Sequence, residues 1–170
     1  MKRNHSAKTK ILVAWLFVSM FLLGQCVAAE PPSDKVIASK DFKFLMGNWN
    51  PSDAGKDDPS TEDYRWFTTH INGRKYKATN DDIYFAVVNG KPVIGGQGGR
   101  LEVTDIKPKQ QEIILSVLRA QYGRHKALKG EVAVSIQNRD QIKFTFKMPA
   151  DWDDAFGRED VSYLRAEEVP

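Results

Sequence analysis

Beyond a polar lead-in at residues 30–40, hydrophobic residues recur in short runs of five to eight, separated by clusters of Gly, Asn, Asp and Pro. Apolar and polar residues alternate within many of these runs, which is the period of a half-buried β-strand, and no stretch sustains the period of a helix. The runs expected as strands are 44–49, 63–71, 74–79, 83–88, 91–95, 100–106, 112–119, 130–137, 141–148 and 161–165. The pattern therefore predicts an all-β domain.

Two Asn-Gly pairs, at 72–73 and 89–90, are strong signals for two-residue hairpins, because both central residues of a type I′ turn need a positive φ. A two-residue turn at each pair puts apolar residues on a common face. The expected partners are Phe67 with Ala78, Thr69 with Tyr76, Phe85 with Ile94 and Val87 with Pro92. The alternation of side chains is thus consistent with both turns.

A third hairpin is expected between 130 and 148. Its apolar residues face each other only when Ile136 lies opposite Ile142, which requires an odd loop at 138–140 rather than a two-residue turn. The same register pairs Val134 with Phe144 and Val132 with Phe146.

Eight to ten sequential antiparallel strands are typical of a closed up-and-down β-barrel, which removes exposed sheet edges. A two-sheet β-sandwich is the alternative. We expect a single β domain at 41–170, preceded by a flexible lead-in at 30–40 and a signal peptide at 1–29.

The signal peptide is predicted from a basic stretch containing Lys2, Arg3 and Lys8 and an apolar run at 11–23. Thirteen helical residues span only about 20 Å, short of the roughly 30 Å hydrocarbon core of a membrane. The small residue Ala29 suits a cleavage site before position 30, so we expect an exported protein, periplasmic or secreted from a bacterium.

Cys26 leaves a second processing route open, because Leu23-Gly24-Gln25-Cys26 resembles a bacterial lipobox. Gln25 argues against lipidation, since that position favours Gly, Ala or Ser. If Cys26 leaves with the signal peptide, no cysteine remains, and disulfides, thiol catalysis and cysteine metal sites are excluded together.

The formal net charge of +3 depends on the N-terminus. The first 29 residues hold four basic and no acidic side chains, and the remainder has 21 basic against 22 acidic residues. A near-neutral domain lacks the positive field on which non-specific nucleic-acid binding depends, so we do not expect a nucleic-acid partner.

Gly47 and Trp49 form a Gly-x-Trp on the first expected strand, and Arg165 lies near the chain end. Together with the run of antiparallel strands, these residues resemble the lipocalin and lipocalin-like (calycin) pattern, and a bacterial relative more than a classical lipocalin. The resemblance implies that the Trp closes one end of a barrel and packs against the Arg, a cation–π contact worth about 0.5 to 2 kcal/mol.

The resemblance and the abundant aromatic residues give a first hypothesis, a protein that binds a small apolar or amphipathic ligand in its barrel. The residues expected to line that cavity are Tyr64, Trp66, Tyr76, Phe85 and Phe144.

The second hypothesis is a periplasmic protein-binding module, such as an inhibitor or immunity protein, that acts through its loops. Residues 119–129 are basic, whereas 151–160 carry five acids against one arginine, and such patches orient encounters with a partner. The residues expected to meet an anionic partner are Arg119, Arg124, His125, Lys126 and Lys129.

Catalytic and metal sites are not expected. The chain after the signal peptide has two distant histidines, His70 and His125, and no set that combines a nucleophile with a base. A calcium loop starting at Asp151 would need Gly where Phe156 stands. The glycine run at 95–99 leads into a strand-like segment, not into the helix of a phosphate loop. We therefore expect neither an enzyme nor a cofactor.

Overall fold

A computed structural model describes residues 32–54, 66–96, 99–119, 127–149 and 157–170. The chain divides into two units, 1–30 and 31–170, and every described residue belongs to the second. Its elements are α2 (Pro32–Ala38), α3 (Lys40–Leu45), β1 (Gly47–Pro51), β2 (Phe67–Ile71), β3 (Arg74–Ala78), β4 (Ile83–Val88), β5 (Lys91–Gly96), β6 (Gly99–Lys109), β7 (Glu112–Arg119), β8 (Leu128–Asn138), β9 (Gln141–Lys147), β10 (Ser162–Arg165) and β11 (Glu168–Val169).

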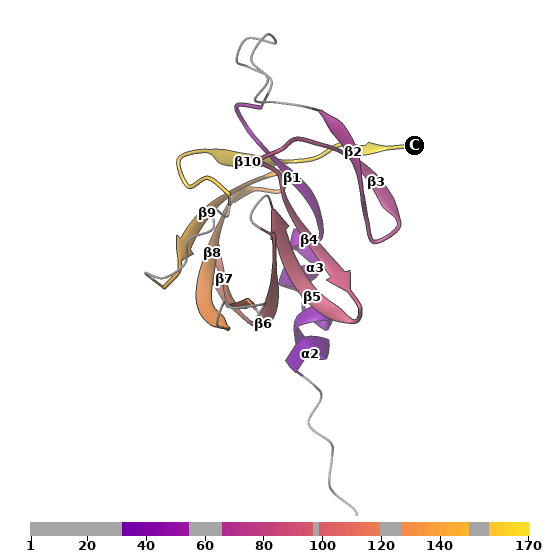
Figure 1. Cartoon of the computed structure of the whole chain (residues 1–170). Helices are drawn as coiled ribbons and strands as arrows, with labels where there is room; N and C mark the ends of the chain where they lie inside the picture. Colours follow the sequence, from indigo (N-terminus) through magenta and orange to yellow (C-terminus); the bar gives the residue numbers. More distant parts are fainter. Residues whose placement is uncertain (1–31, 55–65, 97–98, 120–126, 150–156) are drawn as a thin grey trace, which may run out of the picture. The chain divides into compact units, whose positions relative to one another are not determined.

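Eight strands form a closed antiparallel barrel in the order β1-β10-β9-β8-β7-β6-β5-β4, with β4 returning to pair with β1 (Figure 1). The prediction of an all-β barrel is confirmed, and the β-sandwich alternative is wrong. Closure gives both edges of each of these strands a partner, which a sandwich does not do.

The hairpin β2–β3 is not part of the barrel, contrary to the sequential order expected from the sequence. It forms a separate three-stranded sheet in the order β11-β3-β2, while β1 pairs directly with β4 through Gly47 opposite Phe85. The hairpin instead packs on the outside of the barrel. There Ile71 and Tyr76 form a second apolar cluster with Ala86, Val93 and Ala166. Gly47 allows this approach: its φ is 120°, and the Tyr76 hydroxyl lies 3.4 Å from the position a Cβ would take.

The registers of both Asn-Gly hairpins are confirmed. All four expected pairs are present in β2–β3 and β4–β5. Asn72 and Asn89 have φ values of 51° and 53°, and Gly73 and Gly90 follow with 79° and 75°, as a type I′ turn requires.

The register of β8–β9 is also confirmed, but the odd loop is not. Asn138 lies opposite Gln141, so the turn itself has two residues, Arg139 and Asp140. The extra residue is accommodated by a register shift between Ile136 and Asn138. A bulge in β8 therefore provides the one extra residue that keeps the apolar residues of the two strands on the same face.

The expected flexible lead-in is helical, which corrects the sequence interpretation of 30–40. Ser39 caps α3 by accepting a hydrogen bond from the backbone N–H of Phe42 at 3.0 Å, and Val36, Phe42 and Leu45 are buried in the main core. The strand expected at 44–49 begins only at Gly47, because α3 extends to Leu45. Helices of seven and six residues are too short to display a clear helical period.

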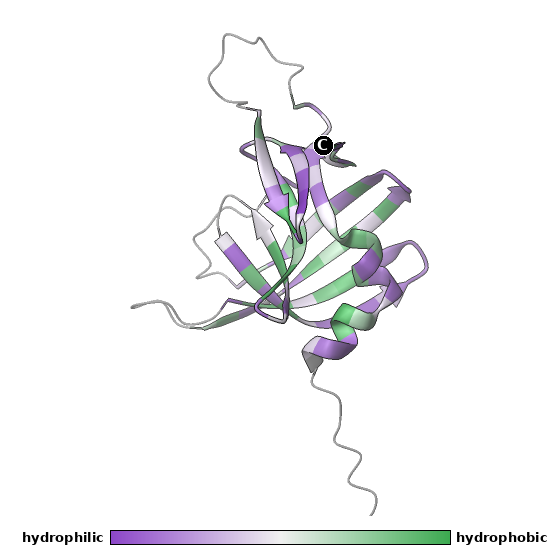
Figure 2. Ribbon diagram, turned by 90° about the vertical axis from the view of Figure 1, so that its right-hand side faces the viewer, coloured by the Kyte–Doolittle hydropathy of each residue, from purple (hydrophilic) through white to green (hydrophobic). Residues whose placement is uncertain are grey.

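The inward face of the barrel is apolar and tightly filled, and Figure 2 shows hydrophilic and hydrophobic positions alternating in bands along the strands. Aromatic rings occupy the centre: the ring centroids of Phe85 and Phe144 are 6.2 Å apart, and those of Phe144 and Tyr163 are 4.9 Å apart. These side chains are fully buried. The core therefore consists of interlocked side chains among the described residues.

Trp49 and Arg165 meet as expected. The Arg165 guanidinium carbon lies 4.2 Å from the Trp49 ring centroid, and the Trp49 indole N–H donates to the carbonyl of Leu45 at 2.8 Å. Arg165 also donates to the carbonyl of Phe44 at 2.8 Å. Trp49 on β1 and Arg165 on β10 thus both hydrogen-bond to the C-terminal end of α3.

Candidate functional site

The residues expected to line a ligand cavity do not come together. Phe85 and Phe144 lie inside the barrel, but Tyr76 belongs to β3 and packs against the outer wall. Trp66 immediately precedes β2 and is exposed, and Tyr64 lies outside the described residues. Sequence reasoning grouped them because it placed the first hairpin in the barrel wall.

The expected basic patch is described only in part. Arg119 ends β7 and Lys129 lies on the adjacent strand β8, opposite Leu118. Arg124, His125 and Lys126 lie outside the described residues, as does most of the acidic segment 151–160. The structure therefore leaves this pair of charged loops as a prediction.

A hollow beside Trp66 is lined by two of the large apolar side chains that the described surface leaves exposed. Trp66, Phe67 and Leu164 have exposed fractions of 44%, 44% and 43%, and Phe67 lies outside the hollow. Trp66 and Leu164 line one hollow of about 230 Å³ between the barrel wall and β3. Lys77 lines it too, with its Nζ 4.5 Å from the Trp66 ring centroid. We call Trp66, Lys77, Leu164 and Glu167 the Trp66 surface.

The backbone under the Trp66 surface is held from both sides. The side-chain amide of Asn50 on β1 donates to the carbonyl of Lys77 at 2.9 Å, and the N–H of Lys77 donates to the carbonyl of Glu167 at 3.0 Å. The N–H of Ala166 in turn donates to the carbonyl of Asn48 at 2.8 Å. These bonds fix β3 against the barrel, so the Trp66 surface is presented on a rigid support.

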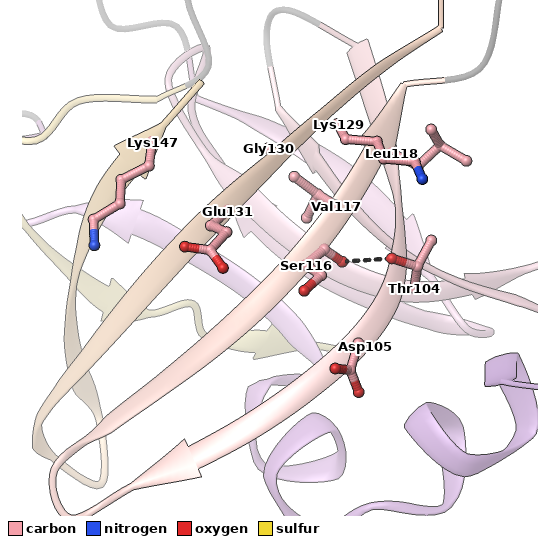
Figure 3. Close-up of a pocket in the computed structure, with 9 residues that line it drawn as sticks. All are labelled: Thr104, Asp105, Ser116, Val117, Leu118, Lys129, Gly130, Glu131 and Lys147. Atoms are coloured by element: carbon pink, nitrogen blue, oxygen red, sulfur yellow. Dashed lines mark hydrogen bonds between the residues drawn. The ribbon is translucent and has the colours of Figure 1, made fainter. Parts of the chain in front are cut away.

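A second hollow is a groove of about 670 Å³ on the outer wall of the barrel, over β6 to β9 (Figure 3). A register shift between Val103 and Asp105 shapes it, and the Thr104 hydroxyl donates to the carbonyl of Ser116 at 3.2 Å. Lys129, Glu131 and Lys147 surround it with charges of both signs. The groove is shallow and holds no aromatic side chain, so it is less suited to recognition than the Trp66 surface.

A buried polar cluster lies between the barrel and the hairpin, and sequence reasoning missed it. It consists of Asn48, Asn50, Thr79 and Asp82. The Asn48 amide donates to Asn50 Oδ1 at 3.3 Å, whereas Asn48 Oδ1 and Thr79 Oγ1 have no hydrogen-bond partner in the described part of the chain. Alternation around Trp49 points Asn48 and Asn50 out of the barrel, so only the packing of the hairpin reveals that they are buried.

Asp82 is the acidic residue of this cluster, and its pKa is strongly shifted. Burial raises its pKa from 3.8 to about 7, a hydrogen bond with the Asn48 side chain opposes the rise, and the charge of Asp81 adds to it. Burial outweighs the hydrogen bond with Asn48, so the surroundings of this carboxyl favour its neutral form.

At the barrel end opposite the helices, the described residues just before β10 pack on the core. A Cβ on Gly157 would lie 2.5 Å from Ile83 Cδ1, so the backbone itself packs on the core. The N–H of Arg158 donates to the Tyr163 hydroxyl at 2.7 Å, and its guanidinium pairs with Asp53 at 2.9 Å. Burial raises the pKa of Tyr163 to about 12, which keeps this hydroxyl neutral.

Within the described ranges, no helix is long and apolar enough to cross a membrane. No group of three potential ligands among His, Cys, Asp and Glu is positioned to hold a metal ion in that part of the chain either. The chain was compared with protein-family models, curated proteins and solved structures, and nothing matched in any of the three.

Proposed function

We propose that this protein is a non-catalytic binding module that docks another protein through the Trp66 surface. The observation that carries the proposal is the hollow lined by Trp66 and Leu164, two of the exposed large apolar side chains of the described chain. Isolated exposed apolar residues are ordinary, but a cluster around a hollow marks an interaction surface.

The chemistry of the Trp66 surface suits a protein partner. Tryptophan is enriched among the residues that dominate binding energy, because its large rigid ring loses little entropy on contact. Lys77 lies over that ring and Glu167 lines the same hollow, which gives the apolar centre a polar rim. The described side chains inside the barrel are buried against one another, which favours an outer surface as the binding site.

We further propose that the chain is an exported relative of the calycin barrels and acts in a bacterial periplasm or outside the cell. The closed eight-stranded barrel and the stack of Arg165 on Trp49 support the kinship. The basic stretch and short apolar run at the N-terminus support export, with cleavage after Ala29.

Site-specific photo-crosslinking in the native host tests the docking proposal. A benzoylphenylalanine replaces Glu167 in one strain and Leu164 in another, both exposed at the hollow, and the matched control carries it at Thr145, an exposed position on β9. We expect both Trp66-surface probes, and not the control, to crosslink the same polypeptide. Trp66→Ala should reduce that product at least tenfold. Equal crosslinking at all three positions, or none at Glu167 and Leu164, would refute the docking site.

A second candidate function is ligand binding inside the barrel, which the inward position of Phe85 and Phe144 favours. A ligand would have to displace these stacked rings and the segment around Gly157, so it would be slow to enter. Native mass spectrometry of protein purified from its host without denaturation tests it. A mass excess of a few hundred daltons that is lost on Phe144→Ala would establish this function, whereas the bare mass together with the crosslinks above would reject it.

A further inference from the structure

The strand β2 leaves one edge of the three-stranded sheet open (Figure 1). The sheet order is β11-β3-β2, and no described strand pairs with the outer edge of β2. Its sequence, Phe67–Ile71, contains no proline and no glycine, and the chain has no register shift in β2–β3. Natural proteins usually blunt an edge strand with such features, so β2 is a template for a further strand.

The hairpin register identifies the groups that face this open edge. Ile71 lies opposite Arg74 across the two-residue turn, and a pair in that position is hydrogen-bonded through the turn. Bonded and non-bonded pairs alternate along an antiparallel ladder. The backbone N–H and C=O of Thr68 and His70 therefore point away from β3, toward the open edge.

The same residues lie on the outward face of the sheet, which is basic. Thr68 lies directly opposite Lys77, and His70 lies opposite Lys75. All four side chains are exposed, and β2 and β3 themselves carry no acidic residue. Glu167, just before β11, lines the same hollow as Lys77. Trp66 begins this row, because Lys77 lies over its ring.

We propose that the partner presents an extended segment with acidic residues at alternate positions, and that this segment adds to the open edge of β2 as a fourth strand. The proposal rests on the proposed function and specifies the chemistry of the partner. Main-chain hydrogen bonds to Thr68 and His70 supply affinity, and the alternating side chains supply specificity.

The spacing of a sheet brings the acidic side chains within reach of the lysines. Neighbouring strands lie about 4.8 Å apart, so a residue beside Thr68 is about 10 Å from the backbone of Lys77. The short side chain of Thr68 lies between the two strands and does not block the contact. A glutamate on the added strand and Lys77 on β3, extended toward each other, span that distance. A carboxylate beside His70 lies in the same relation to Lys75, whose Nζ also donates to the Pro170 carbonyl oxygen at 2.9 Å.

Charge also decides against a second copy of this chain as the occupant. Pairing β2 with β2 would place Thr68 and His70 of the two copies side by side and leave the lysines one strand further away, on β3. Such a pairing brings no acidic side chain of β2 or β3 to these lysines. A strand with acidic residues from a different protein does so, and charge complementarity therefore favours it.

Peptide binding followed by nuclear magnetic resonance tests the proposal on the full domain. The probe is a synthetic seven-residue peptide that alternates Glu with Val, and two matched peptides replace Glu by Lys or methylate alternate backbone nitrogens. We expect the acidic peptide to shift and protect the amides of Thr68 and His70. The lysine and N-methylated peptides should bind at least tenfold more weakly. Equal binding of all three peptides, or shifts that leave β2 unaffected, would overturn the proposal.

Paired variants separate the backbone and charge contributions. Thr68→Pro removes an edge donor that β3 does not use, whereas Thr68→Val keeps it, so only the proline should abolish peptide binding. Lys77→Glu should weaken the acidic peptide at least tenfold, while Lys107→Glu, on β6, should not. Unchanged binding by Thr68→Pro and Lys77→Glu would reject strand addition.

The two proposals fail separately. If crosslinking at Glu167 and Leu164 persists while Thr68→Pro has no effect on it, the docking surface stands and strand addition is wrong. If the domain sediments as a dimer that Thr68→Pro dissociates, the occupant is a second copy, and the acidic-partner proposal is wrong.

Discussion

Asp82→Asn removes one ionisable group from the buried cluster between the barrel and the hairpin, at almost constant volume. Asp82 is only 8% exposed, and Asn48 Oδ1 nearby has no partner among the described residues. Asparagine cannot ionise, but its amide can donate to that oxygen. The variant therefore resembles the protonated protein at every pH.

The magnitude follows from the pKa of Asp82, which is about 7 in the folded protein against 3.8 for an unperturbed carboxyl. The folded state binds the Asp82 proton more tightly than the unfolded state does, so protonation of Asp82 stabilises the fold. This contribution is complete below pH 3.8 and is lost as the pH rises to about 7. Each pKa unit corresponds to about 1.4 kcal/mol, so the full loss is about 4 kcal/mol. About 3 kcal/mol of it falls between pH 5 and pH 8.

Urea unfolding of the wild type and Asp82→Asn at pH 5 and pH 8 measures this effect. We expect the variant to be the more stable protein, with an advantage that widens by about 3 kcal/mol between the two pH values. Asp81→Asn is the control, because Asp81 adjoins Asp82 but is only half-buried, and its advantage should widen by much less. An advantage of Asp82→Asn that stays constant from pH 5 to pH 8 would refute the reasoning.

Three further changes probe the packing of the barrel. Phe144→Ala leaves a cavity in the aromatic core and should destabilise the protein by about 3 to 5 kcal/mol in urea unfolding. Gly157→Ala adds a Cβ at 2.5 Å from Ile83 and at a φ of 75°, so a loss of about 2 kcal/mol or more is expected by the same assay. Arg165→Met keeps the apolar stem but removes the cation over Trp49 and the bond to the Phe44 carbonyl; we expect a loss of about 1 to 3 kcal/mol and a change in tryptophan fluorescence. A wild-type stability in any of these variants would contradict the packing described for that residue.

The parts of the fold that sequence reasoning predicted are those fixed by neighbouring residues. The Asn-Gly pairs demanded positive φ values, and the period-2 alternation then left one register for each hairpin. The sequence did not predict the bulge in β8. It did predict the register of β8–β9, because apolar residues such as Ile136 have to face the core.

The candidate site could not be predicted in the same way. Trp66 was singled out as a ligand contact inside the barrel, but Leu164, which shares its hollow, was not singled out at all. Ninety-eight positions separate these two residues, and no local pattern relates them. Asp82 was missed for the same reason, since its burial depends on the hairpin that packs over β1.

The sequence by itself determined the strands, their turns, the registers of the hairpins and the contact between Trp49 and Arg165 that a resemblance implied. Only the tertiary structure decided that β4 closes the barrel against β1, that β2–β3 joins β11 outside it, and that one edge of β2 remains open. The physical reason is that a hairpin register depends on local backbone geometry and side-chain period. Sheet membership depends on which apolar faces pack together, and that competition involves the whole chain.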